Sequence, residues 1–443
     1  MVVYFLAGSM IVLLVISFYA NNQEVVSPFV AFLAPFSLAT VDLIYNIDKW
    51  KVELQWNTYY VIVGGTIIFV LSCWFTKLIA GTIKIHRYKS RGYTQSKKME
   101  IEQPILVNKY NYYCFAILQV ITFGLCLIAV VKIARRYGVS GTLSMMIAGY
   151  KNLKTFTTAD VSLGKINNLL YDFCYASGYI WFYIVAKNFT ITKKIEKLAL
   201  LNLGLSIAIA LEKGSRGGAV ALLCSGVAMF ILFWQQQNRK GRISLKQLCG
   251  IILIAIIIVG GFQKTGELIG RTSSADFEGY LAVYLSAPIR NLDHYLRGRL
   301  TSPNIFGKMT FINMIKYLGG KLGISAWIYE LDLPALRANG FVTGNVYTTF
   351  YAYLYDFGYI GVPIMMGIMG IVSQLLYRKA KRNKRGRYII NIWSILYAYV
   401  FYLLAFSFFS NKFYEGIVSI QFFKYILYWF IIRYYIERVK LKF

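Results

Sequence analysis

The sequence predicts an all-α, polytopic integral membrane protein of about eleven or twelve transmembrane helices, with one large, partly helical loop on the outer side. Three observations support this prediction. Hydrophobic residues make up 57% of the 443 residues and charged residues 15%, whereas a soluble domain has about 45–50% and about 25%. Long apolar runs recur along the chain, and basic residues gather between them. A soluble enzyme, a disordered chain and a disulfide scaffold are therefore disfavoured.

The apolar runs are long enough to cross a bilayer, which takes about 20 mostly apolar residues. About eleven runs approach this length, and they lie near 2–20, 28–46, 59–80, 111–133, 168–186, 198–212, 218–234, 248–262, 346–376, 388–410 and 417–435. The first lacks a basic flank and a cleavage site, so we expect it to be a retained span. Together the runs predict a single transmembrane domain over residues 1–443.

The positive charge follows the topology. The chain has 48 Lys and Arg against 19 Asp and Glu, a net charge of +29. Short basic segments lie between the apolar runs, at 84–98, 187–197, 239–246, 378–387 and in the tail. This alternation is the positive-inside pattern, which places basic segments in the cytoplasm. Anionic lipid is therefore the expected partner of these segments, and no nucleic acid is expected.

The same pattern orients the chain. The connections 134–167, 213–217, 263–345 and 411–416 are expected outside, with the C-terminus inside and the N-terminus outside. The connection 263–345, of about 80 residues, is much longer than joining two helices requires. Its apolar stretches at 280–289 and 309–329 predict short helices that lie on or dip into the bilayer. Such a loop can roof a cavity, so we expect functional residues there.

Most enzyme signatures are absent from the sequence. It has no Walker loop, no HExxH and no CxxC, and its only histidines are His86 and His294. A histidine metal cluster within one chain is therefore excluded. The acidic pair Glu330 and Asp332 is too weak a signal to indicate a metal, and no cofactor is expected.

The stretch 287–299 concentrates charge on the outer side. If it is helical, four of its charged and titratable residues share one face at spacings of three and four; these are Arg290, Asp293, His294 and Arg297. Such a face could bind phosphate beside a proton carrier. The alternative is a solvated helix with local ion pairs.

A second constellation is the turn Glu212-Lys213-Gly214-Ser215-Arg216 between two short spans. Charges beside a membrane are costly and often mark functional cavities. Arg216 opens the following helix, where its guanidinium and free backbone N–H groups could bind one anion. The alternative is a charged hairpin in which Glu212 pairs with Lys213 or Arg216.

A third constellation opens the span after the large loop, with Asn345 and Tyr347, and continues to Asp356. Asp356 could orient an arginine or accept a proton, or it could make a buried structural hydrogen bond. Arg271, early in the large loop, is a further candidate for anion binding. Together the three constellations predict an arginine-rich outer cavity for an anionic headgroup such as a lipid diphosphate. Arginines can stabilise a leaving diphosphate, so metal is not required.

These motifs resemble a known family. The GSRGG turn that opens a span, the single large late outer loop and the stretch NVYTTFYAYLYDFGYIG at 345–361 resemble bacterial Wzy-type O-antigen and capsular repeat-unit polymerases. The stretch from Glu278 to Tyr295 also resembles that family's loop. The odd number of spans and the outside N-terminus depart from the family's usual pattern.

The resemblance implies a GT-C-type glycosyltransferase fold in the cell inner membrane, with the active site facing the periplasm. It implies a metal-independent, inverting transfer of the growing glycan from undecaprenyl diphosphate to the non-reducing end of a new lipid-linked repeat unit. On this hypothesis Arg216 and Arg290 hold the diphosphate, with Arg271, Lys213 and Arg297 assisting. His294 or Asp356 would accept the hydroxyl proton, and Asn345 and Tyr347 would line the sugar site. A chain-length regulator is an expected partner.

Three alternatives to a polymerase are open. An O-antigen ligase, which transfers glycan to the lipid A core, belongs to the same broad class. A lipid-linked oligosaccharide flippase belongs to another class, and it should not need an outer loop of this length. A non-catalytic membrane partner protein is the third. The sugars, the linkage and the product length are not encoded in any motif that we recognise.

Overall fold

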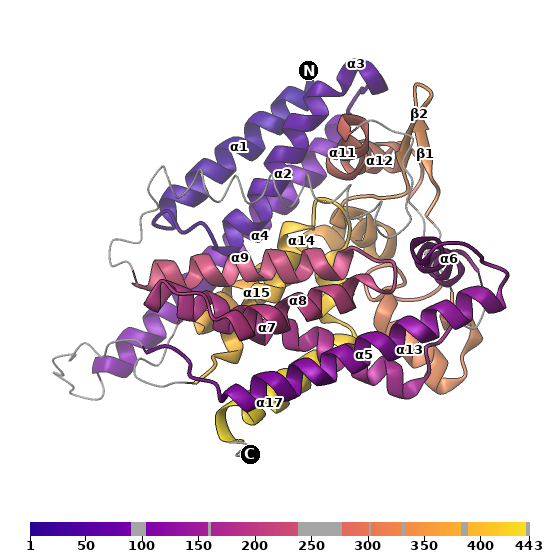
Figure 1. Cartoon of the computed structure of the whole chain (residues 1–443). Coiled ribbons are helices and arrows are strands. Elements are labelled where there is room, and N and C mark those ends of the chain that lie inside the picture. The colour runs from indigo at the N-terminus through magenta and orange to yellow at the C-terminus, as the bar shows by residue number, and fades with distance from the viewer. Residues whose placement is uncertain are drawn as a thin grey trace. The chain divides into compact units, whose positions relative to one another are not determined.

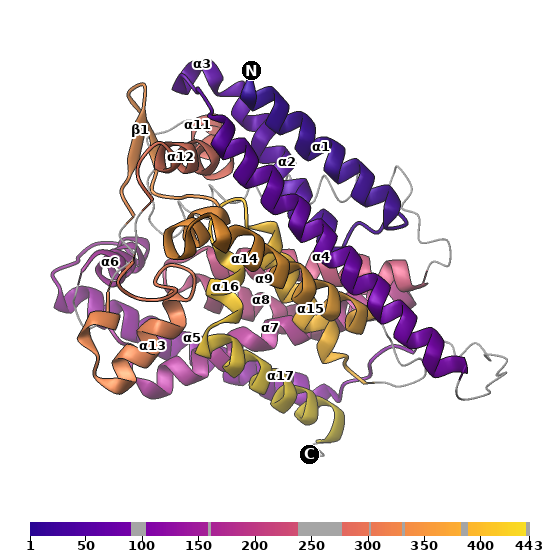
Figure 2. The same ribbon diagram turned by 180° about the vertical axis from the view of Figure 1, so that it is seen from behind.

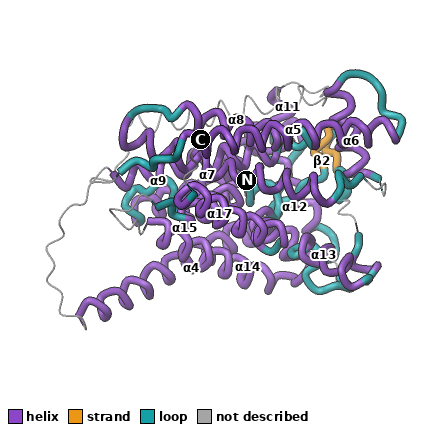
Figure 3. Tube along the Cα trace, turned by 60° about the horizontal axis from the view of Figure 1, so that its bottom comes forward, coloured by secondary structure: helices purple, strands orange, loops and turns teal. Residues whose placement is uncertain are grey.

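The computed structural model describes residues 1–89, 103–157, 161–237, 277–300, 303–329, 333–381 and 389–439. This part of the chain is mostly helical, and its only sheet is one small hairpin (Figure 3). The prediction of a helical fold is therefore confirmed for the described residues.

Seven of the described helices are long and apolar enough to cross a membrane. They are α1 (Val2–Ala20), α2 (Pro28–Tyr45), α4 (Trp56–Lys89), α5 (Lys109–Arg136), α7 (Lys165–Thr192), α9 (Gly217–Gln237) and α14 (Thr349–Lys381). Helices α8 (Lys197–Leu211) and α15 (Ile392–Ala405) are apolar but shorter. Helix α17 (Ile420–Arg438) carries Lys424, Arg433 and Glu437 and is not among the seven. The run 248–262 lies outside the described residues. These spans are those of a multi-pass membrane protein.

The remaining elements are short. They are α3 (Ile47–Trp50), α6 (Leu143–Phe156), α11 (Phe277–Leu285), α12 (Ala287–Leu296), α13 (Ile312–Leu322), the 3-10 turn η1 (Ser325–Trp327), β1 (Leu336–Ala338), β2 (Phe341–Gly344) and α16 (Lys412–Ile417). Strands β1 and β2 pair antiparallel. The short helices expected within 280–289 and 309–329 are present, although the first stretch is divided between α11 and α12.

The described chain forms two compact units, each assembled from separate stretches. Unit 1 comprises Met1–Met99, Ala275–Lys381 and Val400–Phe423, and unit 2 comprises Glu100–Ser274, Arg382–Tyr399 and Lys424–Phe443. The boundary between the units falls within α15 and within α17. Each unit is described by itself below.

In unit 1, α4 lies along α14 (Figure 2). A Cβ at Gly370 would lie 2.7 Å from the carbonyl oxygen of Phe69, so only glycine allows this close approach between the two helices. The basic ends of the helices coincide, because Arg378 Nη1 donates hydrogen bonds to the carbonyls of Thr76 and Lys77, at 3.1 and 2.9 Å. Lys381 forms an ion pair with Glu24, just after α1.

The opposite end of unit 1 holds the N-terminus, the start of α4 and helix α12 (Figure 1). The ring centroids of Phe5 and Trp56 lie 5.8 Å apart. Asp293 of α12 accepts a hydrogen bond from the backbone N–H of Gln55, the residue before α4. The N-terminus and α12 therefore share one side, away from the basic ends. The charge pattern of the sequence predicts this relation.

In unit 2, the central helix α7 contacts α5, α8 and α9. Gln119 of α5 donates hydrogen bonds to the Ser177 hydroxyl on α7 at 3.1 Å and to the Ser206 hydroxyl on α8 at 2.8 Å. Both α7 and α8 present small residues here, since a Cβ at Gly178 would lie 2.8 Å from Ser206 Cβ. Small residues and interhelical hydrogen bonds are the usual means of joining helices within a membrane.

Candidate functional site

Helix α12 is anchored by Asp293, which is 5% exposed. One carboxylate oxygen accepts hydrogen bonds from the backbone N–H of Gln55 at 2.8 Å and from the Thr58 hydroxyl at 2.6 Å. The other accepts from Arg297 Nε at 3.0 Å and lies 2.9 Å from Arg297 Nη2. Because Gln55 immediately precedes α4, the negative charge stands at the positive end of that helix dipole. Both oxygens of Asp293 are thus occupied.

Arg290 lies one turn before Asp293 and is partly buried. Its Nη1 atom is buried, and no described residue accepts a hydrogen bond from it. Burial lowers the pKa of Arg290, while the nearby Asp293 acts in the opposite direction. A guanidinium nevertheless stays protonated at neutral pH. Since Asp293 is engaged by other donors, Arg290 retains capacity to bind an anion.

The four residues predicted to share one face of α12 divide in the structure. Asp293 faces the start of α4, whereas His294 is exposed. Arg297 follows the last residue of α12, pairs with Asp293 and also donates to the carbonyl of Glu53. Arg290 is therefore the guanidinium of this group that has a buried donor without an acceptor among the described residues.

Four tyrosines gather around Tyr351 and interact with Arg290 through Tyr347, and we call them the tyrosine cluster: Tyr295, Tyr347, Tyr351 and Tyr355. The Tyr351 ring centroid lies 4.6, 4.5 and 6.0 Å from those of Tyr295, Tyr347 and Tyr355. Burial raises the pKa of Tyr347, and the positive charge of Arg290 opposes this shift, so the two side chains are neighbours. Tyr347 and Tyr351 are buried, whereas Tyr295 and Tyr355 are partly exposed. The cluster presents aromatic edges and hydroxyl groups beside a cation.

Asn291 joins α12 to the segment that precedes α14. Its Nδ2 donates hydrogen bonds to the carbonyls of Thr343, Gly344 and Val346, at 3.1, 3.3 and 3.0 Å. Asn345 lies within this segment and is exposed. Asn291 was not among the sequence candidates, yet it fixes the predicted sugar-site residues relative to Arg290.

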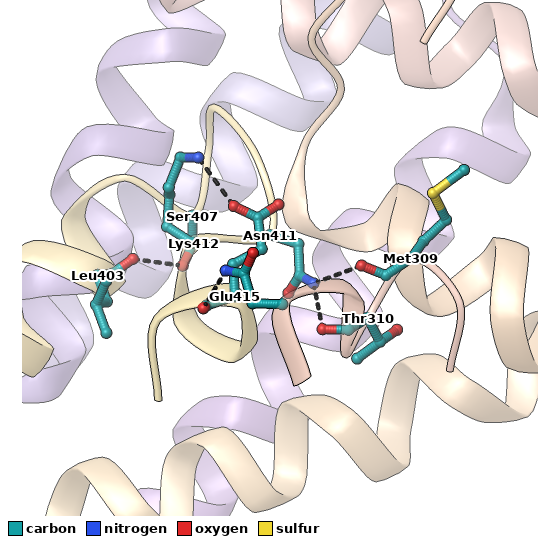
Figure 4. Close-up of polar contacts among 8 residues, drawn as sticks. Met309, Thr310, Leu403, Ser407, Asn411, Lys412 and Glu415 are labelled. Atoms are coloured by element: carbon teal, nitrogen blue, oxygen red, sulfur yellow. Dashed lines mark hydrogen bonds and ion pairs between the residues drawn. The ribbon is translucent and has the colours of Figure 1, made fainter. Parts of the chain in front are cut away.

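The sequence left two interpretations of Asp356, a role in chemistry or a structural hydrogen bond. In the structure, Asp356 makes structural hydrogen bonds. Its carboxylate accepts from the backbone N–H of Met309, at 3.1 and 3.0 Å for the two oxygens, and of Thr310, at 2.6 Å. The carbonyls of the same two residues accept from Asn411 Nδ2 at 3.4 and 3.0 Å (Figure 4). The peptide group between Met309 and Thr310 is thus held at both its N–H and its carbonyl, and each flanking peptide group is held at one edge, which fixes the segment leading into α13. We call this arrangement the 309–310 clamp.

The turn 212–216 of unit 2 is compact because of a glycine. Gly214 has φ +70°, and a Cβ there would lie 2.9 Å from the carbonyl oxygen of Ile147 on α6. Lys213 leans onto α7, where its Nζ lies 3.3 Å from the Tyr171 ring centroid and 3.3 Å from Asn168 Oδ1. Arg216 is 4% exposed and immediately precedes α9, as the sequence predicts.

Glu212 is the unexpected member of this turn. It is 3% exposed, and the only described side chain that hydrogen-bonds to its carboxyl group is the Cys126 thiol, a weak donor. Burial raises the pKa of Glu212 to about 8, although the charge of Lys213 and the nearby Cys126 thiol act against the shift. Burial also lowers the pKa of Lys213 to about 8. No described residue forms an ion pair with Glu212, so the alternative interpretation of a charged hairpin, with Glu212 paired to Lys213 or Arg216, is not observed.

The candidates thus fall into two groups, one in each unit. Arg290, His294, Arg297, Asn345, Tyr347 and Asp356 belong to unit 1, and Lys213 and Arg216 belong to unit 2. Arg271 and the acidic pair Glu330 and Asp332 lie outside the described residues. The sequence analysis did not single out Tyr351 and Tyr355, although Tyr347, Tyr351 and Tyr355 follow one another at spacings of four.

Comparison with family models, with curated proteins and with solved structures finds no match for this chain. Its function is therefore argued from its own residues.

Proposed function

We propose that the protein is a membrane glycosyltransferase that polymerises undecaprenyl-diphosphate-linked oligosaccharide repeat units at the outer face of the cell inner membrane. The growing glycan is transferred from its lipid diphosphate to the non-reducing end of a new lipid-linked repeat unit. The family resemblance of the motifs first suggested this reaction. The chemistry of the α12 region supports it further.

The observation that carries the proposal is Arg290. It combines a permanent positive charge with a buried Nη1 donor that no described residue satisfies, and its nearest carboxylate is bonded elsewhere. A buried donor without a partner costs about 1–3 kcal/mol, and more for a charged group. A protein retains such a cost where a ligand relieves it. Phosphate oxygens match a guanidinium bidentately.

The surroundings of Arg290 suit a glycan attached to that diphosphate. The partly exposed Tyr295 and Tyr355 offer aromatic edges and hydroxyl groups, and the exposed Asn345 offers an amide. Sugars present both apolar faces and hydroxyl groups, so these side chains complement them. In unit 2, Lys213 and Arg216 supply a second set of cations for a diphosphate.

The positive-inside rule supports an outer location for this site. The basic ends of α4 and α14 lie together at one end of unit 1, and such ends face the cytoplasm. Helix α12 and the N-terminus lie at the other end. A substrate delivered on a polyprenyl carrier to the outer leaflet would meet Arg290 there.

In the proposed step, an acceptor hydroxyl oxygen attacks the anomeric carbon of the donor glycan and inverts it. The bond from that carbon to the diphosphate breaks, and the diphosphate leaves with the electron pair. Arg290 stabilises the charge that develops on the leaving group. His294, which is exposed on α12, accepts the hydroxyl proton. Asp356 acts as a positioning residue, since the clamp occupies its carboxylate.

The test uses a deletion strain complemented with variants of the full chain. We expect Arg290→Ala to abolish long surface polysaccharide at normal membrane abundance, and Arg290→Lys to restore little, because lysine cannot bind bidentately. Arg299→Ala is the matched control, since Arg299 is an exposed arginine just after α12. Full polymer length with Arg290→Ala would remove Arg290 from the mechanism.

The glycan profile of the deletion strain also separates the alternatives. Loss of a polymerase leaves surface lipid that carries a single repeat unit. Loss of a ligase leaves uncapped lipid and polymer on the undecaprenyl carrier. Loss of a flippase traps single repeat units inside the cell.

A further inference from the structure

The turn 212–216 contains a carboxyl group that the proposed mechanism does not use. Glu212 is 3% exposed, and among the described residues only the weakly donating Cys126 thiol hydrogen-bonds to it. Lys213, its chain neighbour, points to α7 instead, with Nζ 3.3 Å from Asn168 Oδ1 and 3.3 Å from the Tyr171 ring centroid. The turn thus separates an acid from the cation beside it.

The groups around Glu212 come from three helices. Helix α5 contributes the Cys126 thiol, helix α6 the Tyr150 phenol, and helix α7 the Tyr171 phenol and the Cys174 thiol. All four groups are neutral at neutral pH. Among the described residues, Lys213 is the charged group that acts directly on Glu212.

The next shell of charge is positive on balance. Lys154 of α6 and Asp172 of α7 both act on Lys213. Asp172 is in turn 3.8 Å from Lys424 Nζ of α17, which offsets its negative charge. An anion at the turn would therefore meet an electropositive surrounding.

A buried carboxylate with only a thiol as donor loses its hydration and gains little in return, so the neutral acid is its stable form. The neutral acid carries an O–H group, which is a hydrogen-bond donor. A carboxylic acid kept neutral in this way can bind an anion that a carboxylate would repel. The accessible side of the turn is suited to such a ligand, because Lys213 and Ser215 are partly exposed and Gly217 is exposed.

We propose that Glu212 is a neutral carboxylic acid that donates a hydrogen bond to a phosphate oxygen bound at the turn 212–216. The inference rests on the proposed function, in which Lys213 and Arg216 of this turn contact a diphosphate. The inference adds to that function a hydrogen-bond donor, the Glu212 carboxylic acid, that responds to pH. Above neutral pH, ionisation of Glu212 removes the donor and places a negative charge beside the ligand. The ligand class is a diphosphate, either free or on a lipid.

The test measures binding of inorganic pyrophosphate to the purified full chain in detergent between pH 6.5 and pH 9. Glutamine keeps an N–H donor but cannot ionise, so Glu212→Gln is the informative variant. The measured quantity is the ratio of the wild-type affinity to the Glu212→Gln affinity. We expect this ratio to fall about tenfold or more as pH rises, because that is the contribution of one hydrogen bond to a charged group. The ratio cancels the titration of pyrophosphate itself.

Glu196→Gln is the matched control, because Glu196 precedes α8 at one end as Glu212 follows it at the other. It should leave the wild-type pH response unchanged. Farnesyl diphosphate tested in parallel identifies the source of the ligand. Tighter binding than pyrophosphate with the same Glu212-dependent response supports a lipid diphosphate, and equal binding supports a free one.

A constant affinity ratio across this pH range would overturn the inference, as would a wild-type protein that binds pyrophosphate at no pH. If Glu212→Gln does not fold, infrared difference spectra of the wild type replace it. Pyrophosphate should then shift a carboxylic acid carbonyl band at neutral pH, and no shift overturns the proposal. A deletion strain with normal polymer would instead refute the proposed function and leave this binding result intact.

Discussion

Asp293 on α12 and Glu212 in the turn 212–216 are both buried carboxyl groups, 5% and 3% exposed. Asp293 receives a backbone N–H, a hydroxyl and a guanidinium. Glu212 receives a hydrogen bond only from the Cys126 thiol, a weak donor, among the described residues. Equal burial therefore has different consequences in the two places. The supply of donors, and not depth, decides how firmly a buried carboxyl group is held.

The cations beside these two acids differ as well. Arg297 pairs with Asp293, which leaves Arg290 as the guanidinium with an unmet donor. Near Glu212, Lys213 instead bonds to Asn168 and stacks on Tyr171. In unit 1 the Asp293 carboxylate holds Arg297 and leaves Arg290 with an unmet donor. In unit 2 the neutral side chains of Asn168 and Tyr171 hold Lys213.

The largest expected effect is the removal of the fixed charge. Asp293→Ala leaves the Gln55 N–H, the Thr58 hydroxyl and the Arg297 guanidinium without their shared acceptor. Leaving a buried donor without an acceptor costs about 1–3 kcal/mol for each group, and loss of the partly exposed ion pair with Arg297 adds about 1 kcal/mol. Thermal unfolding in detergent should show a clearly lowered transition temperature. Asp48→Ala, at an exposed position of α3, should leave it within error, and an unshifted Asp293→Ala would contradict the anchoring role.

A second effect, which depends on pH, is expected at Glu212. Its folded pKa, about 8, lies above the unfolded value of about 4.3. The folded state therefore binds the proton more tightly, and this contribution to stability is complete below about pH 4.3 and declines as pH rises to about 8, by up to about 1.4 kcal/mol per pH unit. The stability of Glu212→Gln relative to wild type should rise through this window. A difference independent of pH would show that Glu212 does not titrate there.

The smallest effect is expected at the 309–310 clamp. Asn411→Ala removes two hydrogen bonds to backbone carbonyls, each contributing about 0.5–1.5 kcal/mol. Hydrogen exchange of the Met309 and Thr310 amides should become faster while global stability changes little. Asn313→Ala, which removes a hydrogen bond to Glu415 at an exposed site, is the control and should affect these amides less. Unchanged exchange in Asn411→Ala would mean that Asp356 alone holds the segment.

The sequence was a good guide to the spans and to single positions. Helices α1, α2 and α9 lie within a few residues of their predicted runs, because apolar length is a local property of the chain. Arg216 precedes α9 as expected.

Pairings between distant residues could not be predicted in this way. Gln55 and Thr58 lie more than 200 positions from Asp293, so the sequence did not show that this carboxylate is occupied. The isolation of Glu212 depends on thiols and phenols from α5, α6 and α7. Sequence proximity favoured pairing with Lys213, but the turn directs that lysine to Asn168 instead.

Helix α14 has more length than a membrane requires. Its 33 residues extend about 50 Å at 1.5 Å per residue, whereas the hydrocarbon core measures about 30 Å. The helix is interrupted at Gly358, where the backbone leaves the helical conformation. The segment after that break has about 23 residues and spans about 34 Å, which is enough to cross the bilayer alone.

The first two turns of α14 are therefore surplus to the crossing. They carry Tyr351, Tyr355 and Asp356, two members of the tyrosine cluster and one side of the clamp. Because this segment is not needed for the crossing, its side chains can change without altering how the helix inserts. Substitutions that alter the tyrosine cluster and substitutions that alter membrane crossing thus fall on separate lengths of one helix.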